Sequence, residues 1–154
     1  MDQNKGFLPV LYSKVFGFHN IFLGVDYSRG AIELAKKIAE REECEITFDT
    51  LDILDKQSIV KFSDKFQVIV DKGTFDAISL SESAARDKKL YVEHSSLMME
   101  EEALLLITSC NWTESELVTH FSSHFRHLET VPTPTFTFGE KTGSSTTFCI
   151  FKKK

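Results

Sequence analysis

The chain has 154 residues and a formal net charge of −5, because 18 lysine and arginine residues stand against 23 aspartate and glutamate residues. That length predicts one domain over residues 1–154, and a content of 42% hydrophobic and 27% charged residues excludes wholesale disorder. The acidic balance argues against a nucleic-acid binder, and no apolar run reaches the roughly 18 residues that would span a bilayer. We therefore expect no nucleic-acid partner and no membrane contact.

The cysteines indicate neither a metal site nor a disulfide framework. Cys44, Cys110 and Cys149 are widely spaced and form no CxxC pair, so the sequence predicts no metal. Residues 1–10 have neither the basic nor the apolar region of a signal peptide. Reduced thiols in a cytoplasmic or nuclear protein are the simplest interpretation.

The first half of the chain predicts a strand, a helix and a second strand. Residues 20–26 form a short apolar run that ends on Asp26, as a buried parallel strand would. Ser28 is placed to cap a helix. The apolar side chains of this helix recur at helical spacing: Ala31, Ile32, Leu34, Ala35, Ile38 and Ala39. A strand, an acidic turn and one or two helical turns follow over residues 45–48, 49–55 and 57–62.

The second half continues the alternation of strands and helices. Residues 66–70 form an apolar strand that again ends on an acid, Asp71. Thr113 and Glu116 have the spacing of a capping box for a helix over residues 114–125. The other elements are a helix, a strand, a short apolar run and two alternating runs typical of a hairpin, over residues 84–99, 103–108, 128–130, 135–138 and 146–152. This order predicts a doubly wound α/β sheet with a C-terminal antiparallel hairpin.

Three acids follow predicted strands, namely Asp26, Asp52 and Asp71. In open α/β sheets, ligands bind outside the carboxyl ends of the strands. The two oxygens of a carboxylate at Asp26 match the vicinal hydroxyls of a ribose, and Asp52 followed by Ile53 suits an adenine ring. The alternative is that such acids only solvate turns and cap helices. Three acids along one sheet edge favour a ligand site.

Two short segments are expected at the same edge. Residues 71–76 (DKGTFD) place Lys72 where a substrate would meet a cofactor, and residues 108–112 (TSCNW) add Asn111 and Trp112. The alternatives are a plain strand-to-helix turn for the first segment and a helix-start hydrophobic contact for Trp112. His120 and His124 are four residues apart without a third ligand, which indicates the surface face of a helix.

Three strings, in this order, resemble those of seven-strand (class I) S-adenosylmethionine-dependent methyltransferases. They are residues 24–28 (GVDYS), 70–78 (VDKGTFDAI) and 106–113 (LITSCNWT). More narrowly, they resemble the lysine methyltransferases that act on translation elongation factor 1-alpha, and residues 132–139 (PTPTFTFG) resemble that family's C-terminal segment. The resemblance runs from about residue 17 to residue 154, and it implies a Rossmann-like class I methyltransferase sheet.

The same resemblance implies S-adenosyl-L-methionine as cofactor and elongation factor 1-alpha as protein substrate. Asp26 would hold the cofactor ribose, Tyr27 would line the pocket beside it, and Asp52 and Ile53 would flank the adenine. Asp71 would stand at the boundary between cofactor and substrate, as a cofactor-binding residue and the candidate catalytic residue. The candidate substrate-binding residues are Lys72, Asn111 and Trp112. The family transfers a methyl group in line from a sulfonium to a neutral amine, which requires alignment more than a nucleophilic side chain.

The sequence departs from this family at its start. The family begins with a further helix and a first strand that ends in a DxGxGxG loop, of which only Gly6 resembles a remnant here; Gly6 is therefore a candidate cofactor-binding residue. We expect the chain to be incomplete at its N-terminus, to expose the strand edges beside the missing strand and to bind cofactor weakly. The alternatives are a catalytically impaired, truncated isoform that acts as a binding module, and a nicotinamide-dependent Rossmann enzyme. The strings at residues 70–78 and 106–113 argue against the latter.

Overall fold

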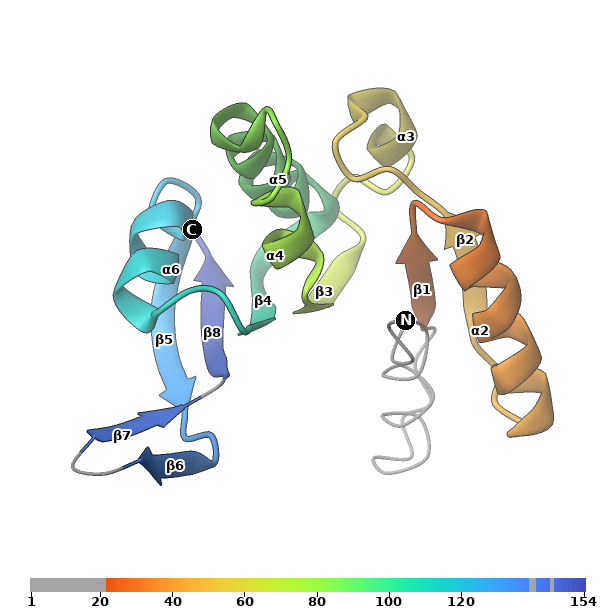
Figure 1. The fold of residues 1–154 in the computed structure, drawn as a ribbon. Coiled ribbons are helices and arrows are strands. Elements are labelled where there is room, and N and C mark those ends of the chain that lie inside the picture. The colour runs from red at the N-terminus through yellow and green to blue at the C-terminus, as the bar shows by residue number, and fades with distance from the viewer. Residues whose placement is uncertain (1–21, 139–140, 145) are drawn as a thin grey trace. The chain divides into compact units, whose positions relative to one another are not determined.

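A computed structural model describes residues 22–138, 141–144 and 146–154, without the side chains of residues 135–138 and 141–144 (Figure 1). The chain divides into two compact units, Met1–Asp52 and Ile53–Lys154. Gly6 lies outside the described residues, and the single domain expected over residues 1–154 stays a prediction. Within the described part, no helix has the length and apolar character needed to cross a membrane.

The first unit contains a strand–helix–strand motif. β1 (Leu23–Asp26) and β2 (Thr47–Thr50) run parallel, with Asp26 opposite Thr50. α2 (Arg29–Arg41) connects them and starts where the Oγ of Ser28 accepts a hydrogen bond from the backbone N–H of Ala31 (3.4 Å). The buried side chains of the motif form a small core: Ile32, Ala35, Ala39 and Phe48. The predicted helix and its serine cap are confirmed.

The second unit is built on a four-stranded sheet. Its strands, in spatial order, are β3 (Phe66–Lys72), β4 (Met99–Ser109), β8 (Thr147–Lys153) and β5 (Phe125–Val131). β3 and β4 are parallel, whereas β8 is antiparallel to both of its neighbours. The helices are α3 (Lys56–Val60), α4 (Thr74–Ile78), α5 (Ala84–Met98) and α6 (Glu114–Phe121) (Figure 1). Among the described strands of these two sheets, β1, β2, β3 and β5 each have a partner on one side only, and the strand edges expected to be exposed beside a missing strand stay a prediction.

Aromatic side chains fill the core between this sheet and its helices. The ring of Phe121 lies 5.0 Å from that of Phe75 and stacks at 5.1 Å on that of Phe151. Tyr91 packs against Phe75 with centroids 5.3 Å apart. Each of these buried rings contributes roughly 1.5–3 kcal/mol through removal of apolar surface from water. Among the residues described with side chains, the buried phenylalanines are Phe48, Phe75, Phe121, Phe125 and Phe151.

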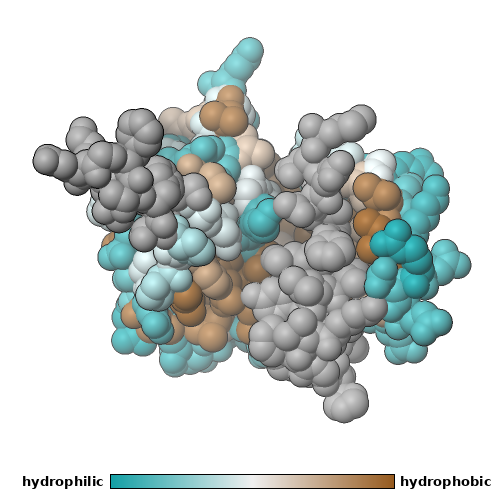
Figure 2. All heavy atoms as spheres, turned by 60° about the horizontal axis from the view of Figure 1, so that its bottom comes forward, coloured by the Kyte–Doolittle hydropathy of each residue, from teal (hydrophilic) through white to brown (hydrophobic). Residues whose placement is uncertain are grey.

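The other face of the sheet is partly open. Ile69 of β3 packs against the core and Asp71 is buried, whereas Val68 and Val70, which alternate with them along the strand, remain 50% and 39% exposed. This alternation follows from the two-residue period of a strand. Apolar side chains gather over part of the molecular surface (Figure 2).

Several predicted boundaries near the C-terminus are wrong. The run at 146–152 does not pair with 135–138: β8 lies between β4 and β5, and the terminal hairpin joins β6 (Thr135–Phe138) to β7 (Lys141–Ser144). β8 is central because its alternate residues Cys149 and Phe151 are buried in the core. The helix predicted to reach residue 125 ends at Phe121, because Phe125 starts β5 and enters the core as a strand residue.

Two further differences concern local elements. The strand predicted at 45–48 begins at Thr47, because the turn that closes α2 extends to Cys44, whose N–H bonds the carbonyl of Ala39 (2.9 Å). No helix was predicted at residues 74–78, which form the short helix α4 directly after the turn. Gly73 precedes this helix with φ of +86°, a backbone conformation that favours glycine.

Candidate functional site

Asp26 occupies the carboxyl end of β1. Its Oδ1 accepts a hydrogen bond from the backbone N–H of Ser28 (2.8 Å), and this bond shapes the turn into α2. Its Oδ2 makes no hydrogen bond to any of the described residues, and the side chain is half-buried. The structure therefore leaves one carboxylate oxygen for a ligand hydroxyl at the end of a parallel strand.

The neighbouring predicted cofactor residues differ in exposure. Tyr27 is 72% exposed, and Asp52 is exposed at the end of the first unit. Ile53 belongs to the second unit, where its side chain packs against the aromatic core. The carbonyl of Ile53 lies 2.6 Å from Nδ1 of the buried His94. Since a carbonyl only accepts, His94 carries its hydrogen on Nδ1, and α5 holds the backbone of Ile53 in place.

Asp71 lies at the end of β3 with 5% of its surface exposed. Its Oδ1 accepts from the backbone N–H of Thr74 (2.7 Å), and its Oδ2 accepts from the N–H of Phe75 (2.9 Å) and the hydroxyl of Tyr91 (2.6 Å). Burial raises the pKa of the Asp71 carboxyl, and these hydrogen bonds oppose that rise. This geometry is that of a positioning residue that caps α4, and a catalytic role for Asp71 stays a prediction.

Tyr91 is the partner that the sequence did not reveal. Burial, followed by the charge of Asp71, raises the pKa of Tyr91 well above the ordinary tyrosine value, so the phenol keeps its proton and donates a hydrogen bond to the carboxylate. Tyr91 lies on α5, twenty residues from Asp71 in the sequence. No local spacing could have predicted that contact.

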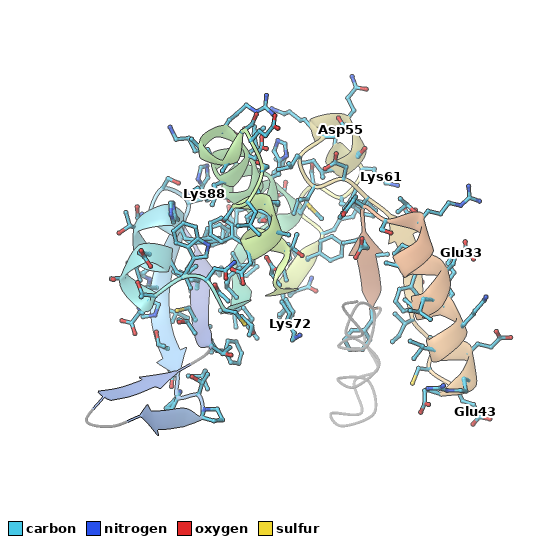
Figure 3. The ribbon with its side chains drawn as sticks, in the orientation of Figure 1. Glu33, Glu43, Asp55, Lys61, Lys72 and Lys88 are labelled. Atoms are coloured by element: carbon cyan, nitrogen blue, oxygen red, sulfur yellow. The ribbon has the colours of Figure 1, made fainter. Side chains whose placement is uncertain are left out.

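Lys72 and Asn111 present exposed polar groups at the ends of β3 and β4. Lys72 is opposite Thr108 in the register and is exposed, with no ion pair to a described residue (Figure 3). Asn111 is also exposed, and its side-chain amide bonds none of the described residues. The structure thus brings these two predicted substrate-binding residues to the same end of the sheet.

Trp112 is anchored toward the helices. Its Nε1 donates to the Oγ of Ser79 (3.2 Å), and its ring packs against Phe75 and His120 with centroids 5.9 and 4.7 Å away. The ammonium of Lys88 lies 4.5 Å from the centre of the same ring. The half-buried indole therefore holds its loop on the fold, and its predicted contact with substrate stays a prediction.

The two histidines expected on one helix face are separated. His120 lies in the last turn of α6, whereas His124 follows the end of that helix. Burial, then the charge of Lys88, lowers the pKa of His120, and Glu116 opposes this effect. In the described ranges, no three histidine, cysteine or acidic residues are grouped so that they could hold a metal ion.

Solved structures with the same architecture define the fold. The chain superposes on a TehB-like SAM-dependent methyltransferase from Corynebacterium glutamicum with a TM-score of 0.65 and 17% identity, covering 99% of this chain and 74% of that one. The N-methyltransferase NodS from Bradyrhizobium japonicum, in complex with S-adenosyl-L-homocysteine, superposes with a TM-score of 0.61 and 15% identity. This match covers 86% of this chain and 66% of that one. These likenesses confirm the Rossmann-like α/β fold of methyltransferases.

Sequence comparison then gives the family. A family model described as "Methyltransferase domain" matches residues 6–147, and the chain belongs to that family. It is 42% identical over 139 residues to EEF1A lysine methyltransferase 2 of Homo sapiens, covering 90% of this chain and 58% of that protein. It is 44% identical over 137 residues to the protein-lysine N-methyltransferase efm4 of Schizosaccharomyces pombe, covering 84% of this chain and 56% of that protein. The chain therefore spans less than two thirds of the length of these curated relatives.

Proposed function

We propose that this chain acts as an S-adenosyl-L-methionine-dependent protein-lysine N-methyltransferase whose substrate is translation elongation factor 1-alpha. The observation that carries the proposal is the 42% identity over 139 residues to a protein named as an EEF1A lysine methyltransferase. A yeast relative named as a protein-lysine N-methyltransferase adds support from a distant organism. The nicotinamide-dependent alternative has no such relative among these matches.

The residues at the strand ends fit the cofactor. Asp26 has one carboxylate oxygen without a described partner, which is the group that a ribose hydroxyl requires. We assign the ribose to Asp26, the pocket beside it to Tyr27 and the adenine to Asp52 and Ile53. Asp71 supports the boundary with the substrate by holding α4. When bound, the cofactor supplies a methyl group activated by its sulfonium.

The protein substrate is assigned to the ends of β3 and β4. Lys72 and Asn111 have polar groups that are exposed and free of described partners there. The carboxylate of Asp71 accepts three hydrogen bonds and so orients the turn before α4, and a direct role of this acid in catalysis stays a prediction. Catalysis then depends on the alignment of a neutral lysine amine with the methyl donor. The cytoplasmic or nuclear location stays a prediction.

The test is methylation of purified elongation factor 1-alpha by the 154-residue chain, with mass spectrometry of its lysine peptides. We expect methyl groups on a lysine only when S-adenosyl-L-methionine is added. Calorimetric titration with the cofactor is run in parallel. Binding of elongation factor 1-alpha without methyl transfer would contradict the enzyme and favour the binding-module alternative.

A further inference from the structure

Asp76 joins α4 to the loop that follows β4. Its Oδ1 accepts a hydrogen bond from the Oγ of Ser109 (2.6 Å), and its Oδ2 accepts from the backbone N–H of Cys110 (2.8 Å). Asp76 and Ser109 are 33 residues apart in the sequence. The register of β3 and β4 explains why they meet, since Lys72 is opposite Thr108 and the N–H of Gly73 bonds the carbonyl of Thr108 (3.2 Å).

The hydroxyl of Ser109 is fully used. It accepts hydrogen bonds from the backbone N–H groups of Asn111 (3.1 Å) and Trp112 (3.0 Å), so its single hydrogen is left for Asp76. Ser109 is 1% exposed, and water cannot easily replace a lost partner there. A group that only accepts is therefore required at position 76.

The loop of residues 109–112 is held from two sides. The Asp76 carboxylate fixes its start through Ser109 and Cys110, and the Nε1 of Trp112 reaches the Oγ of Ser79 at its end. Asp76 and Ser79 lie on α4 and at its C-cap. The shape of the loop, including the outward position of Asn111, thus follows from α4.

We propose that Asp76 is a positioning residue that sets the conformation of the 109–112 loop through Ser109 and so places Asn111 and Trp112 for the protein substrate. The conformational part stands on the hydrogen bonds alone. The part that concerns substrate rests on the proposed function. Asp76 touches no reacting group in this scheme and acts only through the loop.

The first test uses Trp112, the only tryptophan of the chain, as a fluorescent reporter within the loop. In Asp76→Asn, the amide nitrogen must face either the Ser109 hydroxyl or the Cys110 N–H, and two donors then oppose each other. We expect acrylamide quenching of Trp112 to rise about twofold while far-UV circular dichroism is unchanged. The same result is expected for Ser109→Ala, which removes the other partner.

Asp55→Asn is the matched control. Asp55 also accepts from one backbone N–H, that of Gln57, and from one serine hydroxyl, that of Ser58, but it caps α3 (Figure 3). We expect this variant to leave the quenching of Trp112 at the wild-type value. Equal quenching in the wild type, Asp76→Asn and Ser109→Ala would overturn the inference.

The second test separates positioning from cofactor binding. We expect Asp76→Asn and Ser109→Ala to raise the KM for elongation factor 1-alpha about tenfold, with the Kd for S-adenosyl-L-methionine within about twofold of the wild type. If the double variant has a KM no higher than that of either single variant, Asp76 and Ser109 act as a unit. An inactive wild-type chain would contradict the proposed function, and the quenching result would then decide the role of Asp76 by itself. Unchanged KM with altered quenching would overturn the substrate part.

Discussion

The hydroxyl of Tyr91 donates a hydrogen bond to Oδ2 of Asp71 across 2.6 Å, and the two side chains are 1% and 5% exposed. The same carboxylate accepts the backbone N–H groups of Thr74 and Phe75. One buried acid therefore joins α5 to the turn between β3 and α4. Because that turn borders the edge assigned to substrate, the contact links the stability of the fold to the shape of the site.

Replacement of Tyr91 by phenylalanine tests this contact. The change keeps the ring packing but leaves a buried carboxylate oxygen with one donor fewer, so we expect the free energy of unfolding to fall by about 1–3 kcal/mol. Urea unfolding, monitored by circular dichroism, measures this change in the free energy of unfolding. Leu80→Ala, at a side chain that is 79% exposed, is expected to change stability by less than about 0.5 kcal/mol. Equal midpoints for both variants would exclude a stabilising role for the bond.

The titration of His120 depends on Lys88. Burial is the largest cause of the lowered pKa of His120, and the positive charge of Lys88 is the second. Lys88→Met is therefore expected to raise the pKa of His120 part of the way toward the ordinary value of about 6.5. NMR titration of the imidazole C–H signals measures the shift. Lys89→Met serves as the control, because it removes a neighbouring charge that does not contribute to the lowered pKa of His120.

The sign of the corresponding stability effect follows from the direction of that shift. The folded protein favours neutral His120, so its contribution is present above the unfolded pKa of about 6.5 and is lost as the pH falls through the lowered folded value. We expect Lys88→Met to make the unfolding free energy less dependent on pH in this window. A steeper dependence in the variant would contradict the assignment.

Alanine substitutions at Gly73 and Gly30 are expected to change the free energy of unfolding in opposite directions. Gly73 has φ of +86°, and an added Cβ would meet no atom within 4 Å, so Gly73→Ala introduces backbone strain alone, about 1–2 kcal/mol. Gly30 lies in α2, where an added Cβ has room, and Gly30→Ala is expected to stabilise its helix by up to about 1 kcal/mol. Denaturant unfolding, followed by Trp112 fluorescence for the first variant and by circular dichroism for the second, tests both signs.

The ribose assignment predicts a specific loss of cofactor affinity. Asp26→Ala removes the carboxylate oxygen left without a described partner, and we expect the Kd for S-adenosyl-L-methionine to rise about tenfold, or about 1.4 kcal/mol. Calorimetric titration measures it. Asp64→Ala, at an exposed aspartate paired with Lys153, is the control and should leave the Kd unchanged. An unaltered Kd in Asp26→Ala would remove the ribose from this residue.

Local signals in the sequence were sufficient for several elements. The periodicity of α2, its Ser28 cap and the capping box of Thr113 and Glu116 depend on residues within one or two turns of each other, and all three are present. The strand ending at Asp71 was predicted for the same reason. The end of α6 was missed because Phe125 belongs to a strand whose partner β8 is more than twenty residues away.

The sequence by itself determined the α/β class, the acids at the strand ends and, through the three strings at residues 24–28, 70–78 and 106–113, the resemblance to methyltransferases. Only the tertiary structure decided what the acids do. Asp71 is committed to α4 and Tyr91 and Asp76 to Ser109, whereas one oxygen of Asp26 has no hydrogen-bond partner among the described residues. A carboxylate has the same chemistry at all three places. Ser28, Thr74 and Phe75 are local donors, whereas Tyr91 and Ser109 reach Asp71 and Asp76 only when the sheet and helices pack.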